Sequence, residues 1–133
     1  MELGEEDGSL TVLLFDVNFL KHVNDTEGHL AGDQLLRTAA SCIDECFNKG
    51  ENCGCYRIGG DEFAAVIKGC TEEEIHSCLG HFAWAQEREN ISVSVGYARA
   101  ESVTDPGFRA LMSQADQHMY EQKKRIHADG AVR

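Results

Sequence analysis

Asp61 and Glu62 are the residues of this 133-residue chain whose type and spacing most directly indicate chemistry. They follow Gly59 and Gly60, and the four residues lie between two strand-like apolar runs. Two such runs joined through glycines predict a β-hairpin, because glycine accepts the positive φ that tight turns need. Adjacent carboxylates on a rigid tip can bind a hard divalent cation, often shared with substrate phosphates. In isolation the same pattern is also typical of a solvated acidic turn.

A second block of chemistry-bearing residues comes earlier in the chain. Residues 10–17 form an apolar run that suits a central strand buried on both faces, and Asp16 lies near its carboxyl end. A polar connection follows at residues 18–29, and Gly28 indicates a tight turn there. A helix then begins, because apolar residues recur at helical spacing at Leu36, Ala40, Ile43 and Phe47.

Together the two blocks resemble the GGDEF domain of diguanylate cyclases. All five positions of the namesake motif are matched at residues 59–63. The family's longer pattern, D-x-[DN]-x-[FL]-K-x-x-N-D-x-x-G-H-x-x-G-D, is matched at Asp16, Asn18, Leu20, Lys21, Asn24, Asp25, Gly28, His29, Gly32 and Asp33. We therefore expect a GGDEF domain over residues 10–127, a disordered or tag-like segment over 1–9 and a C-terminal tail over 128–133.

The remaining patterns complete a mixed α/β, βαββαβ fold. Thr71 and Glu74 form a capping box that starts a helix, residues 91–97 alternate as a strand, and Asp105-Pro106 starts a last helix. This order predicts a ferredoxin-like or palm-type sheet with packed helices, similar to nucleotidyl cyclases. Such a topology would bring the first strand's end beside the hairpin.

The resemblance implies an enzyme that condenses two GTP molecules into cyclic di-GMP and pyrophosphate. The 3′-hydroxyl of one GTP attacks the α-phosphate of the other, assisted by Mg²⁺ or Mn²⁺. It implies Asp61 and Glu62 as catalytic residues, either of which can be the base. It implies metal ligation by the side chains of Asp16, Asp61 and Glu62 and by the carbonyl of Val17.

The resemblance also implies a substrate-binding set. Asn24 and Asp33 correspond to the guanine readers, since a carboxylate accepts hydrogen bonds from the guanine edge. Without the motif, Asn24 would be interpreted as a turn cap and Asp33 as a surface residue of a first helical turn. The phosphate and close-approach positions are Phe19, Leu20, Lys21, Gly59, Gly60 and Lys123.

The chain departs from the family pattern at three places. The missing arginine and the missing N-terminal segment favour a second hypothesis, a weak or inactive GTP-binding regulatory module, whereas the missing inhibition motif predicts only that feedback inhibition through that site is absent. Residues 126–128 read Ile-His-Ala where the family often has Gly-Arg-Asn, so the usual arginine is missing and Lys124 or Arg125 is left as a substitute. The product-inhibition motif R-x-x-D is absent, since its positions hold Gly50 and Cys53. No match to the usual N-terminal D-x-L-T-G-L-x-N-R segment precedes Leu10, so we expect that segment to be lacking.

The composition narrows the range of molecules that this domain can bind. A net charge of −11 disfavours nucleic acid and direct contact with an anionic membrane surface. With no membrane-length apolar run, we expect a cytoplasmic domain, or the cytoplasmic part of a membrane-bound sensor protein. We expect a homodimer for catalysis and a sensor or dimerisation domain in a longer protein. The six cysteines are interpreted as free, partly buried thiols, because neither Cys53 with Cys55 nor Cys42 with Cys46 has standard zinc spacing.

Overall fold

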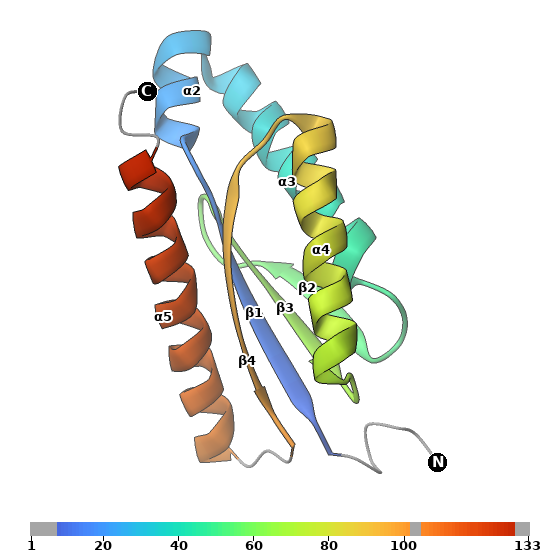
Figure 1. Ribbon diagram of the computed structural model, residues 1–133. Coiled ribbons are helices and arrows are strands. Elements are labelled where there is room, and N and C mark those ends of the chain that lie inside the picture. Colours follow the sequence, from blue (N-terminus) through green and yellow to red (C-terminus); the bar gives the residue numbers. More distant parts are fainter. Residues whose placement is uncertain (1–7, 102–104, 130–133) are drawn as a thin grey trace.

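A computed structural model describes residues 8–101 and 105–129 (Figure 1). Its elements in chain order are β1 (Leu10–Val17), α2 (Leu20–Glu27), α3 (His29–Phe47), β2 (Cys53–Arg57), β3 (Glu62–Lys68), α4 (Glu72–Glu89), β4 (Val93–Ala100) and α5 (Asp105–Asp129).

The four strands form one sheet in the order β2-β3-β1-β4, and every neighbouring pair is antiparallel. Strand β1 is central, and its residues 11–17 are all buried, which explains its unbroken apolar character. Helices α3 and α4 cover one face of the sheet and α5 lies on the other (Figure 1). The predicted βαββαβ sheet with packed helices is therefore confirmed.

The face beneath α3 and α4 holds the larger core. Phe15 of β1 lies between Phe47 of α3 and Phe82 of α4, with ring centroids 5.2 and 5.5 Å away. Phe47 and Phe82 are themselves 5.4 Å apart in an edge-on arrangement, which aromatic pairs prefer. This triangle fixes α3 and α4 to each other and to the central strand.

The opposite face is smaller and depends on close contact between α5 and β4. Val12 and Leu14 of β1 pack there with Leu111 and Ala115 of α5. A Cβ atom added at Gly96 of β4 would overlap the α5 backbone at Met119 and Ala115. Only glycine lets the helix axis come this close, and that approach sets the position of every residue further along α5.

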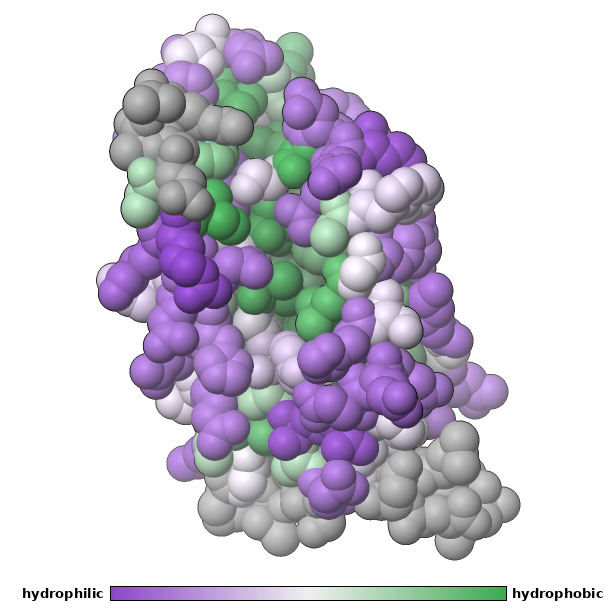
Figure 2. All heavy atoms as spheres, in the orientation of Figure 1, coloured by the Kyte–Doolittle hydropathy of each residue, from purple (hydrophilic) through white to green (hydrophobic). Residues whose placement is uncertain are grey.

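The edge strand β4 borders a hollow between α4 and α5, where apolar side chains gather in Figure 2. The hollow has a volume of about 450 Å³, and Leu79, Phe82, Val95 and Ile126 are among its lining residues. The outward backbone N–H groups of β4 are capped by side chains: Val93 donates to Gln86 Oε1 at 2.8 Å, and Val95 donates to Gln122 Oε1 at 2.6 Å. Both glutamines occupy hydrogen-bonding positions that a neighbouring strand would otherwise take.

Two details differ from the sequence prediction. The polar connection at residues 18–29 contains a short helix, α2, none of whose residues is fully buried. It is short and has only two apolar residues, Leu20 and Val23, so the sequence does not mark it as a helix, and it lies against α3. In α4 the predicted capping box is present, but the sequence spacing Ile75, Leu79, Phe82 predicts Ala83 as the next core-facing residue, whereas Ala83 is exposed and Ala85 is fully buried.

Candidate active site

The end of β1 and the start of β3 lie side by side. Asp16 is paired with Glu62 across the antiparallel ladder, and the Val17 N–H donates to the Asp61 carbonyl at 2.9 Å. The sheet register therefore brings together two segments more than forty positions apart in the sequence. The prediction that the hairpin acids lie beside Asp16 is confirmed.

Asp16, Asp61 and Glu62 each place a carboxylate oxygen within 4.8 Å of the others. Asp16 is 3% exposed, and its Oδ2 accepts a hydrogen bond from Lys123 Nζ at 2.7 Å. Its other oxygen, Oδ1, is buried and accepts no hydrogen bond from any described residue. A buried carboxylate oxygen without a partner is costly, so this atom is available for a ligand.

The cluster holds more negative charge than its surroundings balance. Burial raises the pKa of Asp16, and the neighbouring Asp61 adds to the shift while Lys123 opposes it. Burial also raises the pKa of Glu62, followed by repulsion from Asp16 and Asp61. A cation placed among these carboxylates would relieve both effects.

Lys123 is the cationic partner of this cluster. Its ammonium reaches Asp16 from α5, on the opposite side of β1 from α3 and α4, and the hydrogen bond raises the pKa of Lys123. The family resemblance implies that Lys123 binds phosphate, and in the structure Lys123 contacts Asp16, a member of the carboxylate cluster. Asp116 of α5 is a further acid near Glu62, since it helps to raise the pKa of Glu62. The sequence prediction missed Asp116 because helical position alone does not show which strand end it faces.

The hairpin tip is braced from one side. The Ile58 N–H donates to the Glu62 carbonyl at 2.9 Å, and the Arg57 guanidinium donates to the carbonyls of Gly59 and Gly60 at 3.1 and 2.7 Å. Neither glycine has a positive φ, so the expectation that this turn needs one is wrong. A Cβ atom added at either glycine would meet no protein atom within 4 Å. Packing within the domain therefore does not require glycine at these two positions.

The turn after β1 is held by a buried polar residue. Asn18 is 2% exposed, its Nδ2 donates to Ser92 Oγ at 3.0 Å, and its Oδ1 accepts from Ser94 Oγ at 3.0 Å. The next residue, Phe19, has a left-handed φ of 66°, which is strained for a side chain with a Cβ. The Phe19 ring lies 4.8 Å from that of His127. Asn18 matches the family motif, which implies no role for it, and its two hydrogen bonds show that it fixes the turn after β1.

The two predicted guanine readers lie on neighbouring helices. Asn24 of α2 rests against α3 at Gly32, where an added Cβ would overlap its side-chain oxygen. Asp33 is the next residue along α3 and is exposed. Among the described residues, no hydrogen bond or ion pair joins either of them to the carboxylate cluster. Lys21 is paired with Asp25 one turn away at 2.7 Å, and both side chains are largely exposed.

The donor set fits a hard divalent cation. All three side chains offer carboxylate oxygens, the ligand type that Mg²⁺ and Mn²⁺ prefer, and Asp16 Oδ1 is a buried acceptor with no other partner. An antiparallel βαββαβ sheet with such a cluster at a strand end and a hairpin defines a palm-type, nucleotidyl-cyclase-like domain.

Comparison with known proteins gives the family. The protein-family model described as "Diguanylate cyclase, GGDEF domain" matches residues 2–128 of the sequence. The chain therefore belongs to the GGDEF family of diguanylate cyclase domains, as the motifs at residues 16–33 and 59–63 predict.

The relatives agree in sequence and in fold. The probable diguanylate cyclase DgcI of Escherichia coli (strain K12) is 38% identical over 125 residues, which cover 92% of this chain and 27% of that protein. A microbial GGDEF domain solved with cyclic di-GMP is 31% identical with a TM-score of 0.76, covering 92% of this chain and 77% of that one. The GGDEF domain of DgcB from Caulobacter crescentus, also in complex with c-di-GMP, has a TM-score of 0.77 at 24% identity, over 91% and 75% of the two chains. This chain thus spans about a quarter of the length of the curated relative DgcI.

Proposed function

We propose that this domain condenses two GTP molecules into cyclic di-GMP and pyrophosphate. The observation that carries the proposal is the buried Asp16, whose Oδ1 has no hydrogen-bond partner within an acid cluster completed by the hairpin residues Asp61 and Glu62. Family membership supports the reaction class, and the cluster is the place where we expect the nucleotide phosphates and their cations to bind.

The carboxylates would hold one or two Mg²⁺ or Mn²⁺ ions, together with the Val17 carbonyl. A bound cation would polarise the phosphate oxygens, lower the pKa of the attacking hydroxyl and stabilise the departing pyrophosphate. In the reaction the 3′-oxygen of each GTP forms a bond to the α-phosphorus of the other, and in each case the bond from that phosphorus to the bridging oxygen of the β-phosphate breaks, so two pyrophosphates leave for each cyclic di-GMP formed. The hydroxyl proton passes to a carboxylate of the cluster, for which Glu62 is well suited because its pKa is raised.

The phosphates would be received by the first turn of α2 and by Lys123. The phosphates would meet the main chain of residues 19–21 at the N-terminus of α2, where no side-chain cap is present and the first N–H groups of the helix, at Leu20 and Lys21, would donate to an anion. Lys123 would exchange its Asp16 partner for a phosphate oxygen when a cation takes over the charge of Asp16. Gly59 and Gly60 would leave room for the substrate, since no protein atom fills the space beside them.

Guanine would be read by Asn24 and Asp33. A carboxylate accepts hydrogen bonds from the N1–H and N2–H₂ groups of guanine, and adenine has no such pair of donors. Because Gly32 has no side chain, the Asn24 side chain can lie against α3 at this position, next to Asp33 in the sequence. Both side chains would then contact one base edge.

Each protomer would bind one GTP, so the reaction needs two protomers facing each other. We further propose that this is a cytoplasmic domain whose pairing is driven by a sensor or dimerisation domain of a longer protein. No helix in the described ranges is long and apolar enough to span a bilayer.

The test is product analysis after incubation of concentrated protein with GTP and Mg²⁺ or Mn²⁺. We expect cyclic di-GMP and pyrophosphate from the natural sequence and from Glu87→Ala, an exposed change on α4. Glu62→Ala should give neither product. Equal product from Glu62→Ala would refute the assignment of the cluster.

A second candidate function is a GTP-binding regulatory module with little turnover. The observation that favours it is His127, which occupies the position where the family often carries arginine. His127 contacts Phe19 and Asn18, so the usual arginine is replaced by a residue that packs against the turn after β1. Tight GTP binding without cyclic di-GMP, even after two copies are joined by a fused coiled coil, would select this function.

A further inference from the structure

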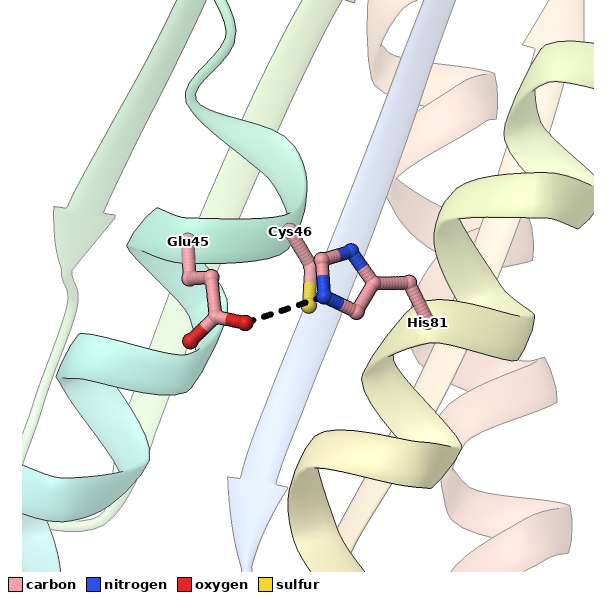
Figure 3. Close-up of side chains that lie close together, drawn as sticks. All are labelled: Glu45, Cys46 and His81. Carbon is pink, nitrogen blue, oxygen red and sulfur yellow. Dashed lines mark hydrogen bonds and ion pairs between the residues drawn. The ribbon is translucent and has the colours of Figure 1, made fainter. Parts of the chain in front are cut away.

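A second group of potential metal ligands lies between α3 and α4, away from the carboxylate cluster. Glu45 and Cys46 come from the last turns of α3, and His81 comes from the middle of α4. Each offers one ligand atom, and the three atoms lie within 4.8 Å of one another. Figure 3 shows the carboxylate, the thiol and the imidazole converging from the two helices.

Packing of the core holds these residues in place. Cys46 is fully buried next to Phe47, and His81 precedes Phe82, so the aromatic contact between Phe47 and Phe82 sets the distance between the helices here. Glu45 and His81 are each 35% exposed at the side chain, so rotation of these two side chains would let an ion reach the buried sulfur from solvent.

The Glu45 carboxylate is already oriented. Its Oε2 lies 2.9 Å from His81 Nε2, and Arg88 donates to Oε1 at 2.8 Å and to Oε2 at 3.1 Å. Arg88 sits two helical turns after His81 on the same helix, and its guanidinium also lies 5.0 Å from the Trp84 ring. A hydrogen-bonding partner outside the ligand set, here Arg88, holds the carboxylate of a metal ligand in one orientation.

Sulfur, imidazole nitrogen and carboxylate oxygen together form a ligand set typical of Zn²⁺. Bond lengths of about 2.0–2.3 Å around a tetrahedral ion place ligand atoms roughly 3.3–3.8 Å apart. Glu45 Oε2 and His81 Nε2, now 2.9 Å apart, would move slightly apart, and the Cys46 sulfur, within 4.8 Å of the other ligand atoms, would approach them by up to about 1 Å. Side-chain rotation at the partly exposed Glu45 and His81 can provide both changes.

We propose that Glu45, Cys46 and His81 form a binding site for a zinc-like transition-metal ion that links α3 to α4. The Cys46 S–H bond is replaced by a sulfur–metal bond, and its proton is released to solvent. His81 binds through Nε2 and keeps its proton on Nδ1, and Arg88 remains hydrogen-bonded to Glu45. The fourth position is left to water. Protons compete with the metal for the Cys46 sulfur and the His81 imidazole, so the affinity should fall as pH decreases.

This site is independent of the proposed cyclase chemistry. It contains sulfur and nitrogen ligands, whereas the cluster at Asp16 contains only oxygen ligands, so the two sites select different ions. Excess Mg²⁺ would occupy the oxygen site and leave the sulfur site to a softer ion.

The experiment is a titration of the whole chain with Zn²⁺, and separately with Co²⁺, in excess Mg²⁺ and under reducing conditions. The single tryptophan, Trp84, reports on binding because its ring lies 5.8 Å from that of His81. We expect a change in Trp84 fluorescence, a thiolate-to-cobalt charge-transfer band in the near ultraviolet, and a rise in melting temperature with Zn²⁺.

Variants identify the ligands. We expect His81→Ala and Cys46→Ala each to weaken Zn²⁺ binding by at least about tenfold and to remove the Zn²⁺-dependent rise in melting temperature. His76→Ala, an exposed histidine on the same helix, and Cys55→Ala, a half-buried thiol on β2, should bind like the natural sequence. Because Cys46 is fully buried, circular dichroism must show that its variant is folded, and the half-exposed His81 provides the test if it is not.

Unchanged Zn²⁺ affinity in His81→Ala, or a cobalt complex without the thiolate band, would overturn the proposal. The three residues would then be only part of the ion-pair network in which Arg88 and His81 join α4 to Glu45 on α3.

Discussion

At the scale of single residues, the acid cluster lowers the stability of the folded domain and at the same time provides a place for a cation. Asp16 and Glu62 are held in positions where burial and mutual repulsion raise their pKa values, and Lys123 offsets only part of the charge. Sites built to bind ligands commonly keep such unfavourable arrangements, and the ligand relieves them.

The first prediction concerns Glu62→Gln. Removing one negative charge from the cluster should raise the free energy of unfolding without metal by about 0.5–2 kcal/mol. The same change should abolish cyclic di-GMP formation and weaken Mg²⁺-induced stabilisation. Chemical denaturation and product analysis measure the two effects, with Glu87→Ala as the control. A less stable variant would contradict the inferred repulsion.

The second prediction concerns pH. Folded-state pKa values raised above the ordinary range mean that the native domain binds extra protons, so these two acids destabilise it as pH rises through that window. Mg²⁺ competes with those protons. The gain in melting temperature on adding Mg²⁺ should therefore be full at neutral pH and should disappear as pH falls below the raised pKa values. Scanning calorimetry with and without Mg²⁺ measures this difference, and a gain that does not depend on pH would count against the cluster as the binding site.

At the scale of elements, a different contact positions each part of the site. The β1–β3 register places Asp16 opposite Glu62, the Arg57 clamp holds the hairpin tip, and the contact of α5 with Gly96 sets where Lys123 emerges. Substitutions in these elements should therefore change the stability of the domain and its activity to different extents.

Gly96→Ala should destabilise the domain by about 1–3 kcal/mol, because the new methyl group overlaps the α5 backbone. It should also lower activity, since α5 must shift and Lys123 with it. The matched control is Gly80→Ala on α4, where an added Cβ meets nothing and the change should stabilise the helix by up to about 1 kcal/mol. Urea unfolding of both variants is the measurement, and equal stabilities would show that the α5–β4 contact can relax.

Gly60→Ala should show the opposite pattern. An added methyl group meets no protein atom and the backbone φ is not left-handed, so stability should change by less than about 0.5 kcal/mol. If the open space beside the hairpin receives GTP, kcat/KM should fall by about tenfold or more, equal to about 1.4 kcal/mol. Full activity in this variant would mean that the substrate does not approach the tip.

At the scale of the whole molecule, the domain has one well-covered face and one that is covered in part. Helices α3 and α4 bury one face, whereas α5 packs on β4 and β1 of the other. On that second face Tyr56 of β2, paired with Ala64, is 59% exposed. A net charge of −11 opposes close association of two copies, so pairing of isolated domains should be weak.

The reaction rate should therefore depend on domain pairing. If each protomer supplies one half of the site, doubling the concentration of the isolated domain should raise the rate about fourfold, by mass action. Fusion to a dimeric coiled coil should make the rate proportional to concentration. Initial-rate measurements over a dilution series distinguish the cases, and a proportional rate in the unfused domain, with monomers shown by sedimentation, would exclude catalysis by a pair.

The sequence by itself determined the fold class, the acid cluster and the family. These depend on local signals: the unbroken apolar run of β1, the capping box at Thr71, and two long motifs whose order specifies a βαββαβ sheet. The strand order and the family resemblance together predicted that Asp16 lies beside the hairpin, and the β1–β3 pairing places it there.

Only the tertiary structure decided the rest. The ion pair between Lys123 and Asp16 joins residues 107 positions apart, and the group of Glu45, Cys46 and His81 arises where two helices cross. The ordinary φ values of Gly59 and Gly60 and the role of Gly96 likewise depend on neighbours from distant elements. Sequence periodicity indicates which face of an element is buried, but close packing between elements sets the distances at which side chains meet.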